Sequence, residues 1–209
     1  MKEIVDRLSS NCDKAIVHAG HHGPLYLVGG QTPFLKAIAK KGERLGVSCV
    51  WLDEIWTMDK PVVVDTETVK NTFYIMDGAD IDCIQTPTKM SCCAEAVYNT
   101  ISEIGAEGKN ISIIGRGHAV QQLATSLVAI DATVTVAHSK TKSLYEATRF
   151  ADIVVIAAPV TPEQVSPLSD KIVIDVSGTF KGFVPEERYI GNIGKLTTSY
   201  ILWRAVQEG

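Results

Sequence analysis

The sequence predicts an α/β protein in which the strands of parallel sheets alternate with helices. Two observations support this prediction. Strand-like and helix-like patterns alternate along the 209 residues, and Val/Ile runs such as Ile153–Ile156 and Ile172–Ile174 are typical of strands buried on both faces. A cluster of Asp, Gly, Pro and Thr at 78–91 interrupts the alternation. We therefore expect a small N-terminal α/β domain over residues 1–89 and a second unit after it.

Hydrophobic periodicity and end signals predict the individual elements. Gly46 is expected to stop one helix, and Ser91 is a plausible N-cap of another. In the first part we expect helix 2–18, strand 25–28, helix 33–45, strand 47–52 and strand 73–76. In the second part we expect helix 91–104, strand 110–114, helix 118–130, strand 132–137, helix 142–149, strand 152–157, strand 171–176 and a last helix from about 196 to 207.

Composition excludes several classes of protein. A net charge of −4 gives no electrostatic reason to expect a nucleic-acid partner. No apolar run reaches the ~18 residues that a membrane helix needs, and the charged N-terminus does not resemble a signal peptide. Five cysteines without a CxxC pair favour a reduced, cytoplasmic protein. The adjacent Cys92 and Cys93 are either buried residues at a helix start or a redox pair.

The stretch from Asn110 to Thr141 carries the strongest functional signal. A β-branched run enters a Gly-Arg-Gly turn, a helical pattern follows, and a second strand ends on His-Ser-Lys-Thr. In a Rossmann unit, the dinucleotide pyrophosphate lies over such a glycine turn, where backbone N–H groups and the helix dipole stabilise the anion. The residues that would contact the cofactor here are Gly115, Arg116, Gly117, His118, Val120, His138, Ser139, Lys140 and Thr141.

The end of the second strand favours NADP over NAD. A carboxylate at this point would accept a hydrogen bond from the ribose 2′-hydroxyl of NAD, but the nearest acid, Asp131, precedes the strand. Arg116, Lys140 and their neighbouring hydroxyls suit a 2′-phosphate instead. The alternative is that both cations are ordinary solvated surface charges. His118 either contacts a phosphate or faces solvent.

The next two strands end in residues that the nicotinamide half of the cofactor would pass. The first ends in the small residues Ala158 and Pro159, and the second in Asp175, Val176 and Ser177. Asp175 is either a site residue or a carboxylate that caps its own loop.

Five motifs, taken in order, carry a resemblance to a known family. IIGRGHAV, ATVTVAHSKT, EATRFADIVVIAAP, IVIDVSG and GNIGKLTTSYIL are similar to motifs of the bifunctional methylenetetrahydrofolate dehydrogenase/cyclohydrolase family, over about residues 108–206. The resemblance implies a Rossmann-type NADP-binding domain at 90–193 and a helix at 194–209 that packs back on the N-terminal domain. It also implies a homodimer. By this resemblance, Arg116 and Ser139 match the residues that bind the 2′-phosphate of NADP. The resemblance further implies that Gly194 contacts the cofactor and that Thr197 contacts the substrate.

The N-terminal half resembles the family less. Counted back from Gly46, Phe34 takes the family's tyrosine position and Ile38 the position of its central catalytic lysine. Lys41 lies one turn after Ile38 and could face the same way, whereas Lys36 and Lys40 should face away. Asp82 matches the family's substrate-binding carboxylate in Asp-Val-Asp-Gly. The Gln-Leu-Pro-Leu-Pro segment of the family is absent, as is its Val-Gly-x-Pro after the glycine turn.

The resemblance therefore implies an NADP-dependent dehydrogenase acting on a one-carbon derivative of a reduced folate or related pterin. Asp82 would orient the substrate, Phe34 would line its pocket, and Lys41 is a candidate proton donor. Loss of the lysine threatens cyclohydrolase more than dehydrogenase activity, because hydrolysis needs an activated water whereas hydride transfer depends on positioning. The alternatives are a non-catalytic NADP-binding sensor or partner subunit, and a reductase with an unrelated small substrate.

A histidine cluster near the N-terminus raises the question of a metal. His18, His21 and His22 lie in or beside a glycine-containing loop, but a zinc site needs three or four convergent ligands and no matching Cys/His pair is evident. We expect no metal and interpret these histidines as polar loop residues.

Overall fold

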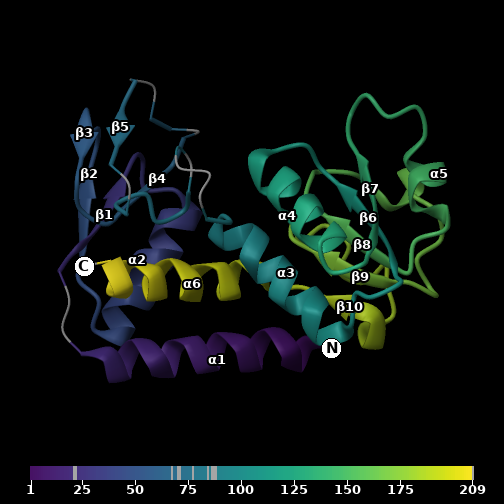
Figure 1. Cartoon of the computed structure of the whole chain (residues 1–209), viewed down its shortest axis with the longest axis horizontal. Coiled ribbons are helices and arrows are strands. Elements are labelled where there is room, and N and C mark those ends of the chain that lie inside the picture. Colours follow the sequence, from purple (N-terminus) through teal and green to yellow (C-terminus); the bar gives the residue numbers. More distant parts are fainter. Residues whose placement is uncertain are drawn as a thin grey trace. The chain divides into compact units, whose positions relative to one another are not determined.

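The computed structural model describes residues 1–20, 23–66, 68–69, 72–76, 78–83, 85 and 89–208, without the side chain of Lys2. Two compact units emerge (Figure 1). Unit 1 comprises Met1–Arg7 and Cys93–Leu196, and unit 2 comprises Leu8–Cys92 and Thr197–Gly209. Helices α1 (Lys2–Ala19) and α6 (Ile193–Glu208) belong partly to each. The domain boundaries expected at 89/90 and 193/194 stay a prediction, since compactness alone does not show which parts fold independently.

Unit 1 contains the predicted dinucleotide-binding sheet. Its helices are α3 (Cys92–Ile104), α4 (His118–Val128) and α5 (Leu144–Arg149), with the 3₁₀ helices η1 (Pro162–Gln164) and η2 (Glu186–Arg188). Its strands are β6 (Asn110–Ile114), β7 (Thr133–Ala137), β8 (Ile153–Ile156), β9 (Ile172–Asp175) and β10 (Tyr189–Ile190).

The five strands form one parallel sheet in the order β10-β9-β8-β6-β7. The chain moves from β6 to β7 in one direction and then returns across β6 to β8, so the connections reverse between β6 and β8. Right-handed crossovers then place α4 and α5 on opposite faces of the sheet, as Figure 1 shows. Every residue of β8 is buried, which confirms the prediction from its unbroken apolar run. Open parallel sheets bind ligands at such a reversal, beyond the carboxyl ends of the strands.

Unit 2 is built on a smaller parallel sheet in the order β2-β1-β4. Its elements, besides parts of α1 and α6, are β1 (Leu25–Val28), α2 (Pro33–Leu45), β2 (Cys49–Leu52), β4 (Val62–Val64) and the pair β3 (Thr57–Met58) and β5 (Tyr74–Ile75). Alternate residues of the sheet enter two different apolar clusters. Leu27 and Val63 pack with α1, α2 and α6, whereas Val28 and Val64 pack with Ile75 in the second cluster.

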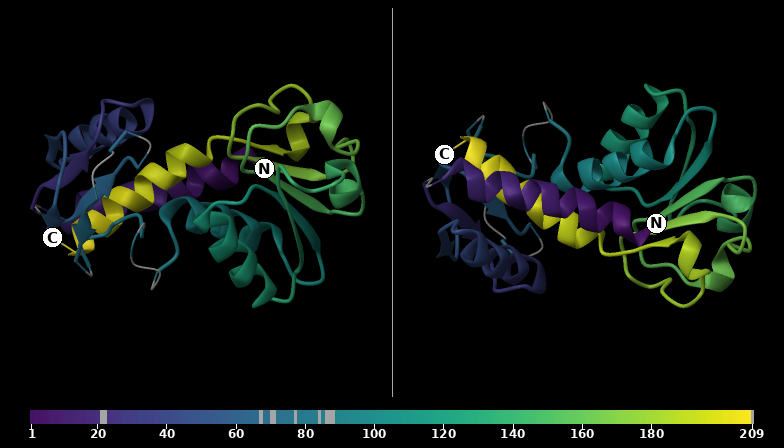
Figure 2. Two further views of the ribbon diagram at one scale, coloured as in Figure 1. Left: turned by 90° about the horizontal axis from the view of Figure 1, so that it is seen from above. Right: turned by 90° about the horizontal axis from the view of Figure 1, so that it is seen from below.

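Local signals explain why α2 has the bounds expected from sequence. The Thr32 hydroxyl accepts a hydrogen bond from Leu35 N at 3.4 Å, and Pro33 starts the helix. Gly46 ends it at φ 81°, a left-handed conformation that favours glycine. Figure 2 shows α1 and α6 running side by side, and in unit 2 the hydroxyls of Ser9 and Ser199 join them at 2.7 Å.

The predicted α/β class with parallel sheets is confirmed. Three short strands, β3, β4 and β10, were not expected, and α6 begins three residues earlier than predicted. The Val62–Val64 run has strand composition but only three residues, too few for a periodic pattern. No helix within the described residues is both long and apolar enough to cross a membrane.

Candidate functional site

The glycine turn after β6 brings the backbone close to its neighbours. A Cβ on Gly115 would lie 3.0 Å from Val120 Cγ2 and 3.3 Å from Ala157 Cβ, so a side chain there would crowd the turn. Val120 is buried beneath the turn, where it supports the loop. Gly117 is the N-cap of α4 and makes no side-chain cap hydrogen bond, which leaves the helix N-terminus open to an anion.

The end of β7 lies beside this turn. Ile114 and Ala137 are partners in the β6–β7 register, and Gly115 N donates to Ala137 O at 2.8 Å. The loop that follows is closed by two hydrogen bonds: His138 N donates to Thr141 Oγ1 at 2.9 Å, and Thr141 N donates to His138 O at 2.8 Å. The structure therefore brings the Arg116 turn and the His138–Thr141 loop together, as expected from the sequence.

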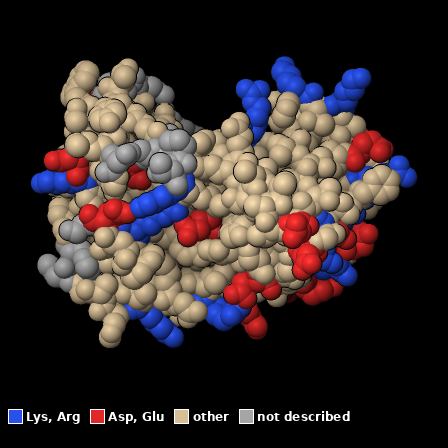
Figure 3. Space-filling model, in the orientation of Figure 1, with Lys and Arg blue, Asp and Glu red and all other residues tan. Residues whose placement is uncertain are grey.

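The donors at these two strand ends are available to a ligand. Within the described part of the chain, the side chains of Arg116, Ser139 and Lys140 are exposed and make no hydrogen bond or ion pair. His118, the first residue of α4, is also exposed. Figure 3 shows Lys and Arg side chains projecting from the upper edge of unit 1 in that view. An uncapped helix N-terminus, an unpaired hydroxyl and two unpaired cations fit a dinucleotide that carries an extra phosphate.

The residues after β8 and β9 lie along the same edge of the sheet. Ile156 and Asp175 are register partners, so Ala158 and Ser177 follow adjacent strand ends. Ala158 is half-buried and Pro159 exposed. The Ser177 hydroxyl donates to Asp175 Oδ1 at 2.8 Å and lies 2.7 Å from Thr179 Oγ1, so it already helps to fix its own loop.

The carboxylate of Asp175 accepts hydrogen bonds from the loop that follows β9 and holds this loop in place. It is 2% exposed and also accepts hydrogen bonds from Gly178 N and Phe180 N, both at 2.7 Å. The hydroxyl of Tyr189 donates to its second oxygen at 3.1 Å. Burial and the Asp175 charge raise the pKa of Tyr189 to about 12, so this hydroxyl stays protonated. These contacts favour the loop-capping interpretation of Asp175.

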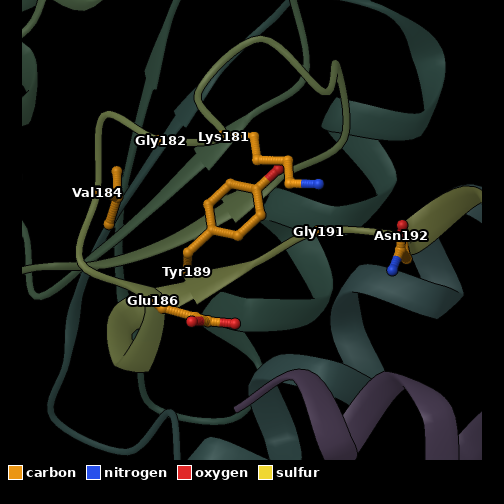
Figure 4. Close-up of a pocket in the computed structure, with 7 residues that line it drawn as sticks. All are labelled: Lys181, Gly182, Val184, Glu186, Tyr189, Gly191 and Asn192. Carbon is orange, nitrogen blue, oxygen red and sulfur yellow. The ribbon is translucent and has the colours of Figure 1, made fainter.

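Beside Tyr189 lies a cavity of about 560 Å³ (Figure 4). The sequence motifs alone did not predict this cavity. The residues that line it are Lys181, Gly182, Val184, Glu186, Tyr189, Gly191 and Asn192. A Cβ on Gly191 would lie 2.8 Å from the Tyr189 hydroxyl oxygen, so the absence of a side chain lets the ring pack against the backbone.

In unit 2, helix α2 carries three residues singled out by the resemblance. Phe34 lies in its first turn and is 37% exposed. Ile38 is completely buried in the cluster formed with α1 and α6. Lys41 is buried as well, whereas Lys36 and Lys40 are exposed, so the expectation about which lysines share the face of Ile38 is confirmed.

Lys41 is held by groups from two other helices. Its Nζ lies 2.9 Å from Asp13 Oδ1 and 3.1 Å from Ser9 Oγ, and it also donates to the Ser199 hydroxyl. Burial lowers the pKa of Lys41, although the hydrogen bond and charge of Asp13 oppose this effect. Its contacts pair the ammonium with groups of α1 and α6 within the helical core of unit 2.

Asp82 lies in a separate polar cluster of unit 2. Its Oδ1 accepts a hydrogen bond from Cys92 N at 2.9 Å. Burial raises the pKa of its carboxyl group, while that hydrogen bond and the charge of Arg204 oppose the rise. Cys83 follows at φ 55°, in the left-handed region, where the resembling motif has glycine. Arg204 Nη1 donates to Ile81 O at 3.1 Å, which joins this turn to α6.

The remaining candidate residues occupy different surroundings. Thr197 is buried in α6 and belongs to unit 2, whereas Gly194 is exposed in the first turn of α6 and belongs to unit 1. His18 is exposed at the end of α1, and His21 and His22 lie outside the described residues.

Comparisons with known proteins identify the family. A family model described as "Tetrahydrofolate dehydrogenase/cyclohydrolase, NAD(P)-binding domain" matches residues 91–205, more than half of the chain. The chain belongs to this family. The match confirms the resemblance and the Rossmann-type domain, and it confirms the expected cofactor at the level of an NAD(P)-binding domain.

Members of the family show the extent of the likeness. The "Bifunctional protein FolD" of Thermosipho africanus is 41% identical over 138 residues, which cover 56% of this chain and 50% of the relative. That of Dehalococcoides mccartyi strain BAV1 is 36% identical over 207 residues, which cover 89% of this chain and 67% of the relative. The chain thus spans about half the length of the curated relative from Thermosipho africanus.

Solved structures agree with this fold. The bifunctional FolD enzyme of Campylobacter jejuni superposes with a TM-score of 0.71 at 20% identity, covering 99% of this chain and 96% of that one. A methylenetetrahydrofolate dehydrogenase/cyclohydrolase of Thermoplasma acidophilum gives 0.71 at 19% identity, with the same coverage of each chain.

Proposed function

We propose that this chain is an NADP-dependent dehydrogenase that oxidises methylenetetrahydrofolate or a closely related one-carbon derivative of a reduced pterin. One observation carries the proposal. The chain is a member of the tetrahydrofolate dehydrogenase/cyclohydrolase family, and at the adjoining ends of β6 and β7 it presents donors that have no partner among the described residues, those of Arg116, Ser139 and Lys140. These donors suit the 2′-phosphate that distinguishes NADP from NAD.

The remaining cofactor contacts follow from the same edge of the sheet. Gly115, Gly117 and His118 would hold the pyrophosphate at the N-terminus of α4. His138 and Thr141 shape the loop that presents Ser139 and Lys140. We assign Ala158, Pro159, Ser177 and Gly194 to the path of the nicotinamide half, and Val120 to support of the glycine turn.

The hydride transfer requires mainly that the protein position the substrate and the cofactor. Bound NADP⁺ supplies the hydride acceptor. When a hydride leaves the methylene carbon, the lone pairs of the two flanking nitrogens stabilise the cation that remains, so no general base is required. The residues of this chain would orient the substrate and exclude water. Asp82 would bind the pterin, and Phe34 and Thr197 would complete its surroundings.

Cyclohydrolase activity should be weak or absent. Hydrolysis of the methenyl product needs a group that activates water and moves protons. Ile38 stands at the family's lysine position and is fully buried among apolar residues. Lys41, the nearest replacement, is bound to Asp13, Ser9 and Ser199, which argues for a structural role over proton donation.

The test is NADPH formation, followed at 340 nm, with purified protein, NADP⁺ and methylenetetrahydrofolate. We expect turnover with NADP⁺ and much slower turnover with NAD⁺. A parallel assay with methenyltetrahydrofolate should show hydrolysis no faster than in buffer. If none of the reduced pterins tested were oxidised, the dehydrogenase proposal would be wrong.

A second candidate function is a non-catalytic NADP-binding sensor or partner subunit. One observation favours it: Ile38 occupies the position that the resemblance gives to the family's catalytic lysine. Separate titrations with NADPH and tetrahydrofolate discriminate between the two functions. Both should bind to a dehydrogenase, whereas only NADPH should bind to the sensor. We also expect a homodimer, as in the family resemblance, which sedimentation of the purified protein can test.

A further inference from the structure

We propose that Lys181 makes the nicotinamide site of this protein prefer the reduced cofactor, NADPH, over NADP⁺. The inference rests on the proposed NADP site and concerns the cavity beside Tyr189, two of whose lining residues, Gly191 and Asn192, belong to the GNIGKLTTSYIL motif. Lys181 lines this cavity, and within the described residues it forms no ion pair or hydrogen bond. Its charge is therefore available to act on whatever occupies the cavity.

The position of the cavity suits the nicotinamide end of the dinucleotide. The phosphate-binding groups lie at β6 and β7, and the carboxyl ends of β8 and β9 come next across the reversal in the sheet. Asp175, the last residue of β9, is the register partner of Ile156 at the end of β8 and binds the Tyr189 hydroxyl at 3.1 Å. Tyr189 thus places one wall of the cavity beside the two strand ends that a cofactor reaches from β6.

The cavity is also preorganised for a planar ring. The four hydrogen bonds to the buried Asp175 carboxylate include the one from Tyr189, and the Tyr189 ring packs against Gly191. A fixed aromatic wall offers a flat face for stacking. The volume of about 560 Å³ is ample for a nicotinamide and its ribose.

Charge then discriminates between the two oxidation states. The oxidised nicotinamide ring carries a positive charge, and the reduced ring is neutral. A nearby ammonium therefore raises the free energy of bound NADP⁺ and leaves that of bound NADPH nearly unchanged. Figure 4 shows Lys181 at the hydroxyl end of the Tyr189 ring and Glu186 at the opposite end. Glu186 should act with the opposite sign.

The experiment compares dissociation constants for the two cofactors. NADPH binding is followed by its fluorescence, and NADP⁺ binding by competition. In Lys181→Met, we expect the ratio of the dissociation constant for NADP⁺ to that for NADPH to fall about three- to tenfold. The ratio falls because the variant lacks the ammonium that repels the positively charged ring of NADP⁺, and the effect is moderate because the cavity is partly hydrated. Lys181→Arg should keep the wild-type ratio, and Glu186→Gln should raise it.

Lys140→Met is the matched control. The 2′-phosphate is present in both oxidation states, so loss of Lys140 should weaken both cofactors equally and leave their ratio unchanged. An unchanged ratio in Lys181→Met, or equal weakening of both cofactors, would overturn the inference and leave the proposed NADP site standing. If the wild-type protein bound neither cofactor, the proposed function would fail together with the inference.

Discussion

The ammonium group of Lys41 lies 2.9 Å from a carboxylate oxygen of Asp13, and both residues belong to the helical core of unit 2. The Lys41 side chain is only 8% exposed, so removing its partner would leave a buried charge. We expect Asp13→Asn to lower the free energy of unfolding by about 3 kcal/mol. Urea titrations of the two proteins measure this, and a loss below about 0.5 kcal/mol would contradict the structural role assigned to the pair.

The burial of Lys41 predicts a pH dependence. The pKa of Lys41 is lowered in the folded protein, so the unfolded chain binds more protons just below the ordinary lysine pKa. Stability contributed by this group should therefore rise with pH between the folded pKa and about 10.4. Because Lys41→Met removes the group, the difference in unfolding free energy between wild type and variant isolates it. A difference that fell or stayed level between pH 8 and 10 would disprove this interpretation.

Asp82 should matter for the substrate and not for the cofactor. We expect Asp82→Asn to raise KM for methylenetetrahydrofolate at least about tenfold, the loss of one charge-assisted contact, with NADPH affinity unchanged. Because burial raises the pKa of Asp82, KM should also increase as pH falls through this raised value. Equal effects of the substitution on folate and NADPH would instead indicate a folding defect.

Ser139 should control the choice between NADP and NAD. In Ser139→Asp, a carboxylate at the end of β7 would repel the 2′-phosphate and accept a hydrogen bond from a 2′-hydroxyl. We expect NADPH to bind about tenfold more weakly, with NADH affinity equal or better. Ser139→Ala is the matched control and should lose less NADPH affinity. Fluorescence titration with both nucleotides gives the comparison, and an unchanged preference in Ser139→Asp would rule out a 2′-phosphate at this loop.

The Ile38→Lys variant tests whether this position can accommodate the family's lysine. The residue is fully buried in an apolar cluster, so Ile38→Lys would bury an unpaired ammonium and should lower the unfolding free energy by about 3 kcal/mol or more. Ile38→Met should cost less than about 1.5 kcal/mol. Thermal unfolding compares the two variants. If the lysine variant were as stable as the methionine variant and hydrolysed methenyltetrahydrofolate, the site would have kept its cyclohydrolase environment.

Substitutions of Asn192 test whether its left-handed backbone conformation limits the residue type at this position. It lies at φ 61°, in the left-handed region, and its carbonyl accepts a hydrogen bond from Lys195 N. Asn192→Ala should cost about 1 kcal/mol, because alanine is disfavoured in the left-handed region. Asn192→Gly should stay within about 0.5 kcal/mol of wild type. Chemical unfolding of both variants checks this, and equal stabilities for alanine and glycine would mean that the conformation imposes no strain.

Sequence patterns predicted the parts of the fold that depend on neighbours along the chain. The bounds of α2 follow from Thr32, Pro33 and Gly46, and the buried strands from their Val/Ile runs. The short strand Val62–Val64 was missed because three residues carry no periodicity. The turn residues Cys83 and Asn192 both have a positive φ, a backbone conformation that their residue types do not predict.

Contacts between distant residues could not be predicted. The partners of Lys41 come from two other helices, α1 and α6, with Ser199 lying 158 residues away. Asp175 and Tyr189 are 14 residues apart, and their hydrogen bond depends on the pairing of β9 with β10. By contrast, the adjoining ends of β6 and β7 were predicted, because consecutive strands of a Rossmann unit pair directly.

One measurement tests the central claim most directly: titration of the same protein sample with NADPH and with NADH. If Arg116, Ser139 and Lys140 bind a 2′-phosphate, NADPH should bind at least about tenfold more tightly, and this advantage should shrink as salt screens the exposed charges. Equal affinity for the two nucleotides, or tighter binding of NADH, would contradict the account.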